Sequence, residues 1–344
     1  RCLYVNMNNF YFQGRGIADF AGEFVGQAGQ VLLIDQVFKQ PNWSRELREC
    51  YDKYPQLKII FTGSSVMRLK EENPELNGLV MSYNLRSRHL VCTTPSPTPH
   101  HRHRKREPHT HFAPLSLDEI VSNHEAIAGD IVKAVDPTTF FADYLHHGFY
   151  PFFLENRNFM ENLLKTMNMM TEVDILLIKQ IELKYLTKIK KLFYLLALNG
   201  PQAPNISKLA DEIDTSRATV MNYIKYLADA RLINLIYNPG QQFPKKPSKV
   251  MMHNPNLMYV IYPITSSTQE VMETFFVNTL WKDHLVNQGD KDHCYLVDNK
   301  LRFRVCDALV ADKSRNAGGT IYARYHQKIG HGDRIPLWLL GMLY

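Results

Sequence analysis

The chain has 344 residues, of which 45% are hydrophobic and 22% are charged, and its formal net charge is +6. These proportions fit a globular protein of two or three domains and exclude collagen, coiled coils and wholesale disorder. No apolar stretch approaches the ~20 residues that a membrane-spanning helix needs, and polar residues interrupt the N-terminal region, so we expect neither a membrane span nor a signal peptide. The five cysteines form no CxxC pair. We therefore expect no disulfide framework or zinc ribbon, and a reducing cytoplasm fits.

Most of the net positive charge comes from one segment, residues 86–112, which holds six Arg or Lys residues against a single Glu107. The same segment contains six histidines and four prolines and has no helical or strand periodicity. Its composition predicts a disordered segment. A second interpretation is that these codons are read in a shifted frame. In either case, the net charge of the whole chain does not indicate a nucleic-acid-binding domain.

The first 85 residues alternate short apolar runs with amphipathic stretches. We expect strands at 3–5, 31–34 and 58–61 and helices at 17–25 and 43–54, the latter with Leu47, Cys50 and Tyr51 on one face. Strands that alternate with helices predict an α/β fold with a parallel sheet covered on both faces.

The regular pattern returns at Pro114. Ser116 and Glu119 have the spacing of a capping box for a helix through about residue 131. A second helix is expected at 140–145, followed by one long helical region at about 160–199.

Residues 205–236 have two apolar faces at helical spacing, with Thr215 and Ser216 between them and a strand at 232–237. The segment resembles a winged helix-turn-helix. This resemblance implies that the second helix faces a DNA major groove with exposed Ser216, Arg217, Thr219 and Asn222. Lysines would contact phosphates, namely Lys225, Lys245, Lys246 and Lys249. Four basic and four acidic residues balance within 205–236, so a partner protein is the alternative to DNA.

Two polar segments follow apolar strands in the N-terminal region. Asp35 ends the run Val31-Leu-Leu-Ile34, where a carboxylate can hold Mg²⁺ through water beside nucleotide phosphates. The next residue, Gln36, stands where a glutamate would accept a proton from the attacking water. Thr62-Gly-Ser64-Ser follows the next strand.

Together, "VLLIDQVFKQPNWSRELRECYDKYPQLKIIFTGSS", the helix-turn-helix and the terminus "IPLWLLGMLY" resemble AAA+-type P-loop ATPases of bacteria and archaea. The resemblance is to the group with a winged helix and a nuclease-like end domain, and it covers nearly the whole chain. It implies ATP and Mg²⁺ as cofactors, with Mg²⁺ on Asp35 and the γ-phosphate near Thr62 or Ser64. The implied parts are a partial ATPase core (1–85), the segment 86–112, a helical lid (113–183), the winged helix (184–250) and a small α/β end domain (251–344).

One departure from the family is the missing phosphate-binding loop. No GxxxxGK[ST] loop occurs in the chain; in the family it lies just before the strand at 3–5, at or beyond the first residue here. We therefore expect a truncated or degraded copy with little or no ATP hydrolysis.

The end domain offers a further alternative, a metal-dependent nuclease. Glu273 lies on an expected helix and could match the helical acid of nuclease-like folds, but no E-x-K strand follows. A hairpin is expected at 295–297 and 301–305 around Asp298-Asn299-Lys300, and a packed segment at 335–341. We therefore expect a structural or docking role for this domain before a catalytic one.

Overall fold

The computed structural model describes residues 1–64, 73–83, 113–152, 158–262, 267–309 and 319–343. Its contacts divide the chain into an N-terminal unit (1–85 with 172–183) and a C-terminal unit (86–171 with 184–344). The segment 86–112, predicted to be disordered or frame-shifted, lies outside the described residues. Within the described parts, every helix is too short or too polar to cross a bilayer.

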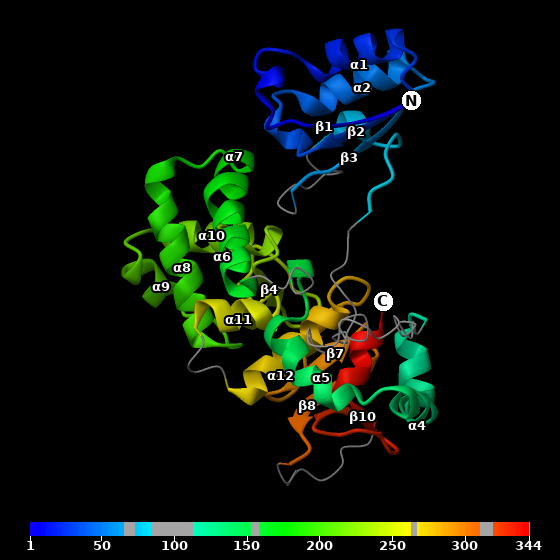
Figure 1. The fold of residues 1–344 in the computed structure, drawn as a ribbon. Coiled ribbons are helices and arrows are strands. Elements are labelled where there is room, and N and C mark those ends of the chain that lie inside the picture. The colour runs from blue at the N-terminus through cyan, green and yellow to red at the C-terminus, as the bar shows by residue number, and fades with distance from the viewer. Residues whose placement is uncertain (65–72, 84–112, 153–157, 263–266, 310–318, 344) are drawn as a thin grey trace. The chain divides into compact units, whose positions relative to one another are not determined.

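The N-terminal unit is built on a three-stranded parallel sheet with the order β1-β2-β3. Its strands are β1 (Cys2–Asn6), β2 (Val31–Asp35) and β3 (Lys58–Phe61), with Asn6 beside Asp35 in the register. The connecting helices α1 (Ile17–Gly26) and α2 (Trp43–Lys53) lie side by side on one face (Figure 1). The expected α/β architecture is therefore confirmed here.

Alternation along the strands decides which side chains enter the core. Leu32 and Ile34 point toward the helices and are fully buried, together with Leu47 and Cys50 of α2. On the opposite face Tyr4 and Ile60 are 60% and 61% exposed. The expectation of a sheet covered on both faces is thus not met by the described residues. Tyr51 is 56% exposed, so its assignment to the buried face of α2 was wrong.

The helices after residue 113 begin with α4 (Leu117–Ala134) and α5 (Pro137–His147). The Ser116–Glu119 capping box is present, as expected. The long helical region expected at about 160–199 is divided into several helices: α6 (Phe159–Met169) runs into a π-helical turn (Met170–Ile175) and the short α7 (Leu176–Ile178). Gln180 then has a positive φ of 51°, which ends the helix before α8 (Leu186–Asn199).

The segment after α8 forms α9 (Ile206–Glu212) and α10 (Arg217–Asp229), followed by β4 (Ile233–Ile236) and β5 (Lys249–Met252). β4 and β5 pair antiparallel. The apolar faces expected from the sequence are buried, and Leu209, Val220, Ile224 and Leu227 have 3% exposure or less.

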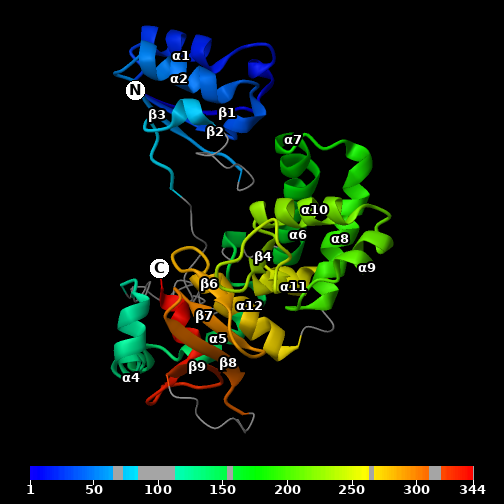
Figure 2. The ribbon, with the colours of Figure 1, turned by 180° about the vertical axis from the view of Figure 1, so that it is seen from behind.

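The C-terminal part of this unit holds a five-stranded sheet with the order β10-β9-β8-β7-β6; β6 to β9 are labelled in Figure 2. The strands are β6 (Val286–Gln288), β7 (Cys294–Val297), β8 (Leu301–Asp307), β9 (Thr320–Tyr325) and β10 (Arg334–Pro336). The expected hairpin is present as β7 and β8, and Asp298 and Asn299 both have positive φ, as a type I′ turn requires.

Two helices precede this sheet, α11 (Pro255–Ile261) and α12 (Thr268–Leu280). Phe276 of α12 packs against Tyr295 and Phe303, which fixes α12 on one face of the sheet. The terminal segment Leu337–Met342 is a buried 3-10 helix, which agrees with the packed segment expected there.

Candidate functional site

The residues predicted for a nucleotide site begin with Asp35, at the carboxyl end of the central strand β2. Its Oδ2 accepts hydrogen bonds from Tyr4 (2.9 Å) and from Asn6 Nδ2 (2.7 Å). Its Oδ1 accepts one from the Thr62 hydroxyl. These contacts arise because parallel strands end at the same edge of the sheet, so that residues following three different strands meet.

Gln36 continues this edge in a strained conformation. Its φ of 55° and ψ of 46° are left-handed, a region that a residue other than glycine occupies only at a cost. The backbone amide of Gln36 donates to Thr62 Oγ1 at 3.0 Å, and the side-chain Oε1 of Gln36 accepts from Asn8 Nδ2 at 2.8 Å. Thr62 is therefore held between Asp35 and the backbone of residue 36.

Ser64, the other residue predicted to lie near the γ-phosphate, makes a different contact. Its hydroxyl donates to Asp174 Oδ2 at 2.6 Å, within the N-terminal unit. Burial raises the pKa of the Asp174 carboxyl, and the bond from Ser64 and the charge of Lys39 oppose this rise. The structure thus brings Asp35, Gln36 and Thr62 together and ties Ser64 to the segment 172–183.

The oxygen atoms at this edge are better suited to bind a magnesium ion than to bind phosphates. A carboxylate, hydroxyls and amide oxygens are the hard oxygen ligands that Mg²⁺ takes, usually with water retained. A phosphate cradle needs free backbone amides, for example at a helix N-terminus. At α1 these amides are occupied, since Ile17 and Ala18 both donate to the Glu46 carboxylate, the latter at 3.2 Å. Among the described residues, no group of three or more His, Cys, Asp or Glu residues forms a metal cluster.

The residues predicted to face DNA lie at and after the N-terminus of α10. Ser216 caps the helix by accepting from the Thr219 amide at 3.1 Å. Arg217 donates to Ser207 Oγ on α9 at 2.9 and 2.6 Å. Asn222 is exposed, whereas Lys225 is paired with Asp229 one turn later. The helix therefore presents Arg217 and Asn222, while Lys225 already has a carboxylate partner.

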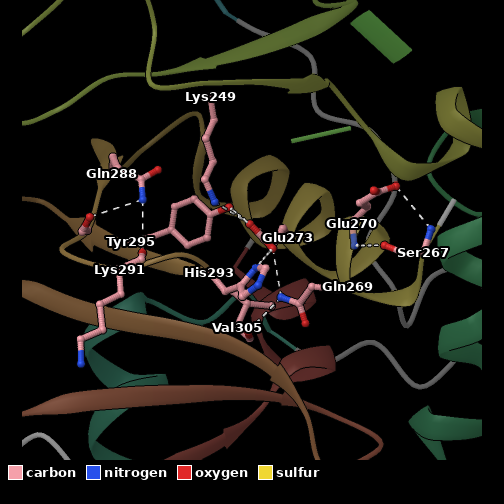
Figure 3. A network of polar contacts seen from close by, with 11 residues as sticks. Lys249, Ser267, Gln269, Glu270, Glu273, Gln288, Lys291, His293, Tyr295 and Val305 are labelled. Carbon is pink, nitrogen blue, oxygen red and sulfur yellow. Dashed lines mark hydrogen bonds and ion pairs between the residues drawn. The ribbon is translucent and has the colours of Figure 1, made fainter. Parts of the chain in front are cut away.

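Lys249 was expected to contact phosphate, and that expectation is wrong. It is 6% exposed on β5, and its ammonium lies 3.1 Å from the Glu273 carboxylate. Glu273, the candidate nuclease acid on α12, is 1% exposed. It also accepts hydrogen bonds from His293, Tyr295 and Gln269 (Figure 3). We call these five side chains the Glu273 cluster.

The Glu273 cluster determines the ionisation of its central carboxyl. Burial raises the pKa of Glu273, but the His293 bond, the Lys249 charge and the Tyr295 and Gln269 bonds outweigh it and lower the pKa to about 2. Burial and Glu273 together raise the pKa of the Tyr295 hydroxyl far above its ordinary value. Glu273 is therefore a charged, fully engaged group that holds α12 to β5 and β7.

Sequence reasoning missed three residues at the first site: Tyr4, Asn6 and Asn8. The available signal was the strand at 3–5 itself, because a parallel neighbour of β2 places the residue after its own end beside Asp35. It also missed that Glu273 and Lys249 are partners, since 24 residues separate them in sequence.

Comparisons with known proteins match two separate segments. Residues 1–89 match a family described as an AAA domain, and residues 138–264 match a family described as a domain of unknown function. An uncharacterized protein of Methanocaldococcus jannaschii is 24% identical over 221 residues, which cover 62% of this chain and 44% of that protein. The chain thus spans less than half the length of this curated relative. No solved structure matches the chain. The first match supports an AAA-type domain in residues 1–89.

Proposed function

We propose that the AAA-type domain in residues 1–89 forms the magnesium-binding half of an ATPase site, and that residues 1–344 by themselves hydrolyse ATP slowly or not at all. The observation that carries this proposal is the meeting of Asp35 and Thr62 at the carboxyl edge of the parallel sheet. Ligands of open α/β sheets bind at that edge. Within the proposal, Asp35 holds water-bound Mg²⁺ and Thr62 orients the carboxylate.

Each residue has a defined part in this proposal. Bound Mg²⁺ would supply charge that neutralises phosphate oxygens. Asn6 and Tyr4 donate to Asp35 Oδ2 and hold the carboxylate in one rotamer. Gln36 positions the Thr62 hydroxyl through its backbone amide. The Gln36 side chain, unlike a glutamate, cannot take a proton from water.

Two features make us expect slow hydrolysis by residues 1–344 on their own. The chain contains no GxxxxGK[ST] sequence, and the amides at the start of α1 are engaged by Glu46. Without a cradle for the β- and γ-phosphates, binding and positioning of the nucleotide lose their main contribution.

The proposal is tested by ATP turnover in the wild-type chain and in Gln36→Glu, with Asp52→Asn as a surface control. Gln36→Glu adds a proton acceptor but no phosphate cradle. We therefore expect all three proteins to release phosphate at the uncatalysed rate. Turnover in the wild-type chain, or a gain of about tenfold or more in Gln36→Glu, would show that the chain assembles a complete site.

A second candidate function uses residues 184–250 as a winged helix that binds DNA or a partner protein. The observation that favours it is a hollow beside α10, whose described lining includes the cations Arg217 and Lys246 and no acid. Lys225 and Lys249 both have carboxylate partners, so fewer free cations support this candidate than the sequence suggested. A nuclease built on Glu273 is less favoured still, because metal binding would require the carboxylate to leave four donors.

A further inference from the structure

The five-stranded sheet has one face on α12 and a second face with a different chemistry. Along β8, Phe303 and Val305 are buried against the helix side, at 0% and 1% exposure. The intervening Arg302 and Arg304 point to the opposite face, since side chains alternate along a strand. In the register, Arg304 lies between Cys294 of β7 and Tyr322 of β9.

This second face is hollowed by a cavity of about 440 Å³, a size within the usual range for small-molecule sites. We call it the β7–β9 pocket. Its walls are residues 288–291 in the turn after β6, the outward face of β7, β8 and β9, and the loop residues Asn238 and Pro239. All of these residues belong to the C-terminal unit.

The charges that line the β7–β9 pocket are unbalanced. Among the described residues that line it are four cations, Lys291, Lys300, Arg302 and Arg304, and one acid, Asp290. Asp290 lies 3.8 Å from Arg302 Nη1, and both side chains are mostly exposed. Such an exposed pair is weak, so the pocket keeps a strong positive field that attracts an anion.

Arg304 is the residue that most directly indicates a ligand. Its Nε is buried, and no hydrogen-bond partner or ion pair satisfies it within the described parts of the chain. A buried donor without a partner is costly, and a guanidinium is costlier than a neutral group. The planar fork of an arginine matches two oxygens of a phosphate.

The remaining lining fits the rest of such a ligand. Tyr322, 5% exposed, neighbours Arg304 across the strands, and Pro239 and Leu296 contribute apolar surface. Gln288 and Lys291 are fixed in the turn by the bond from Gln288 Nε2 to the Lys291 carbonyl (3.3 Å; Figure 3). We propose that the β7–β9 pocket binds a phosphate-bearing ligand, with the phosphate on Arg304 and Lys291.

Cys294 lies in the pocket wall and provides a local readout. We expect ADP, added without magnesium, to slow the reaction of Cys294 with N-ethylmaleimide, as measured on its peptide by mass spectrometry. Exposed Cys2, in the N-terminal unit, is the internal reference and should react at an unchanged rate. Arg304→Gln should weaken the protection at least about tenfold, the loss expected for a charge-assisted hydrogen bond. Arg304→Lys should retain part of it.

The control variant is Lys133→Gln, which removes an exposed cation on α4. ADP should protect Cys294 in this variant as it does in the wild type. Inorganic phosphate and a short single-stranded oligonucleotide are tested beside ADP. The compound that protects Cys294 at the lowest concentration identifies the source of the phosphate. Protection by any of the three supports the proposal. Equal protection by adenosine, protection unchanged in Arg304→Gln, or no protection by any of the three phosphate compounds would overturn it.

Discussion

Replacing Lys249 with methionine is expected to lower the free energy of unfolding of the C-terminal unit by about 3–5 kcal/mol. Lys249 and Glu273 are 6% and 1% exposed, and they lie 3.1 Å apart. Methionine fills the space of the lysine stem but leaves the carboxylate buried without its cation. Removing one partner of a buried pair costs more than the pair contributes, because the other charge stays desolvated.

Urea unfolding measures this effect when the tryptophan fluorescence comes only from the C-terminal unit. The chain has three tryptophans, and Trp43→Phe leaves Trp281 and Trp338, both in that unit. In this background, Lys133→Met removes the cation of an exposed pair and should cost less than about 0.5 kcal/mol. The double variant Lys249→Met with Glu273→Gln should recover most of the loss. A cost for Lys249→Met no larger than for Lys133→Met would contradict the role of the pair.

Acidification from pH 7 to pH 5 is expected to destabilise the C-terminal unit by about 2 kcal/mol through His253 alone. Burial, and then the charge of Arg231, lower the pKa of His253 to about 3. In the unfolded chain a histidine has a pKa of ~6.5. Below that pH the unfolded state binds a proton that the folded state does not. The contribution of neutral His253 to the free energy of unfolding is therefore complete above pH ~6.5 and is lost as the pH falls toward 3.

The groups that contact the ring of His253 are neutral. Its Nδ1 lies 2.9 Å from Asn234 Oδ1, and its ring meets Trp281 edge to face. His253→Gln keeps a neutral polar group facing Asn234, and we expect it to remove the 2 kcal/mol loss. Glu273 does not interfere, because its lowered pKa makes its contribution disappear only between about pH 4.5 and 2. The Lys249→Met/Glu273→Gln double variant should thus keep the full loss between pH 7 and 5; an unchanged loss in His253→Gln would contradict the assignment.

Local patterns were enough to predict the edge of the N-terminal sheet. Asp35 and Thr62 each follow a short apolar run, and parallel strands separated by helices place such residues together. The helix-turn-helix elements were likewise predictable, because Leu209, Val220 and Leu227 follow the 3.6-residue period of a buried helix face.

Contacts between residues distant in sequence could not be predicted in this way. Ser64 meets Asp174, which is 110 residues away, and nothing in the TGSS segment indicates that partner. Lys249 follows Lys245 and Lys246 and was grouped with them as a surface cation. It differs because it begins the buried strand β5, where all four residues are buried. The pairing with Glu273 depends on the tertiary packing of α12, which sequence periodicity does not report.

A role for Asp35 as a magnesium ligand, at an edge without a phosphate cradle, is tested most directly by Mn²⁺ binding followed by electron paramagnetic resonance. Mn²⁺ takes the same oxygen ligands as Mg²⁺. We expect the wild-type chain to bind it with a dissociation constant on the order of 1 mM, Asp35→Asn to lose that site, and Asp52→Asn to retain it. ATP chelates Mn²⁺ itself, so binding is expressed against free Mn²⁺; on that scale, addition of ATP should leave the affinity of the site nearly unchanged. Binding that survives Asp35→Asn, or ATP that tightens it a hundredfold, would contradict the account.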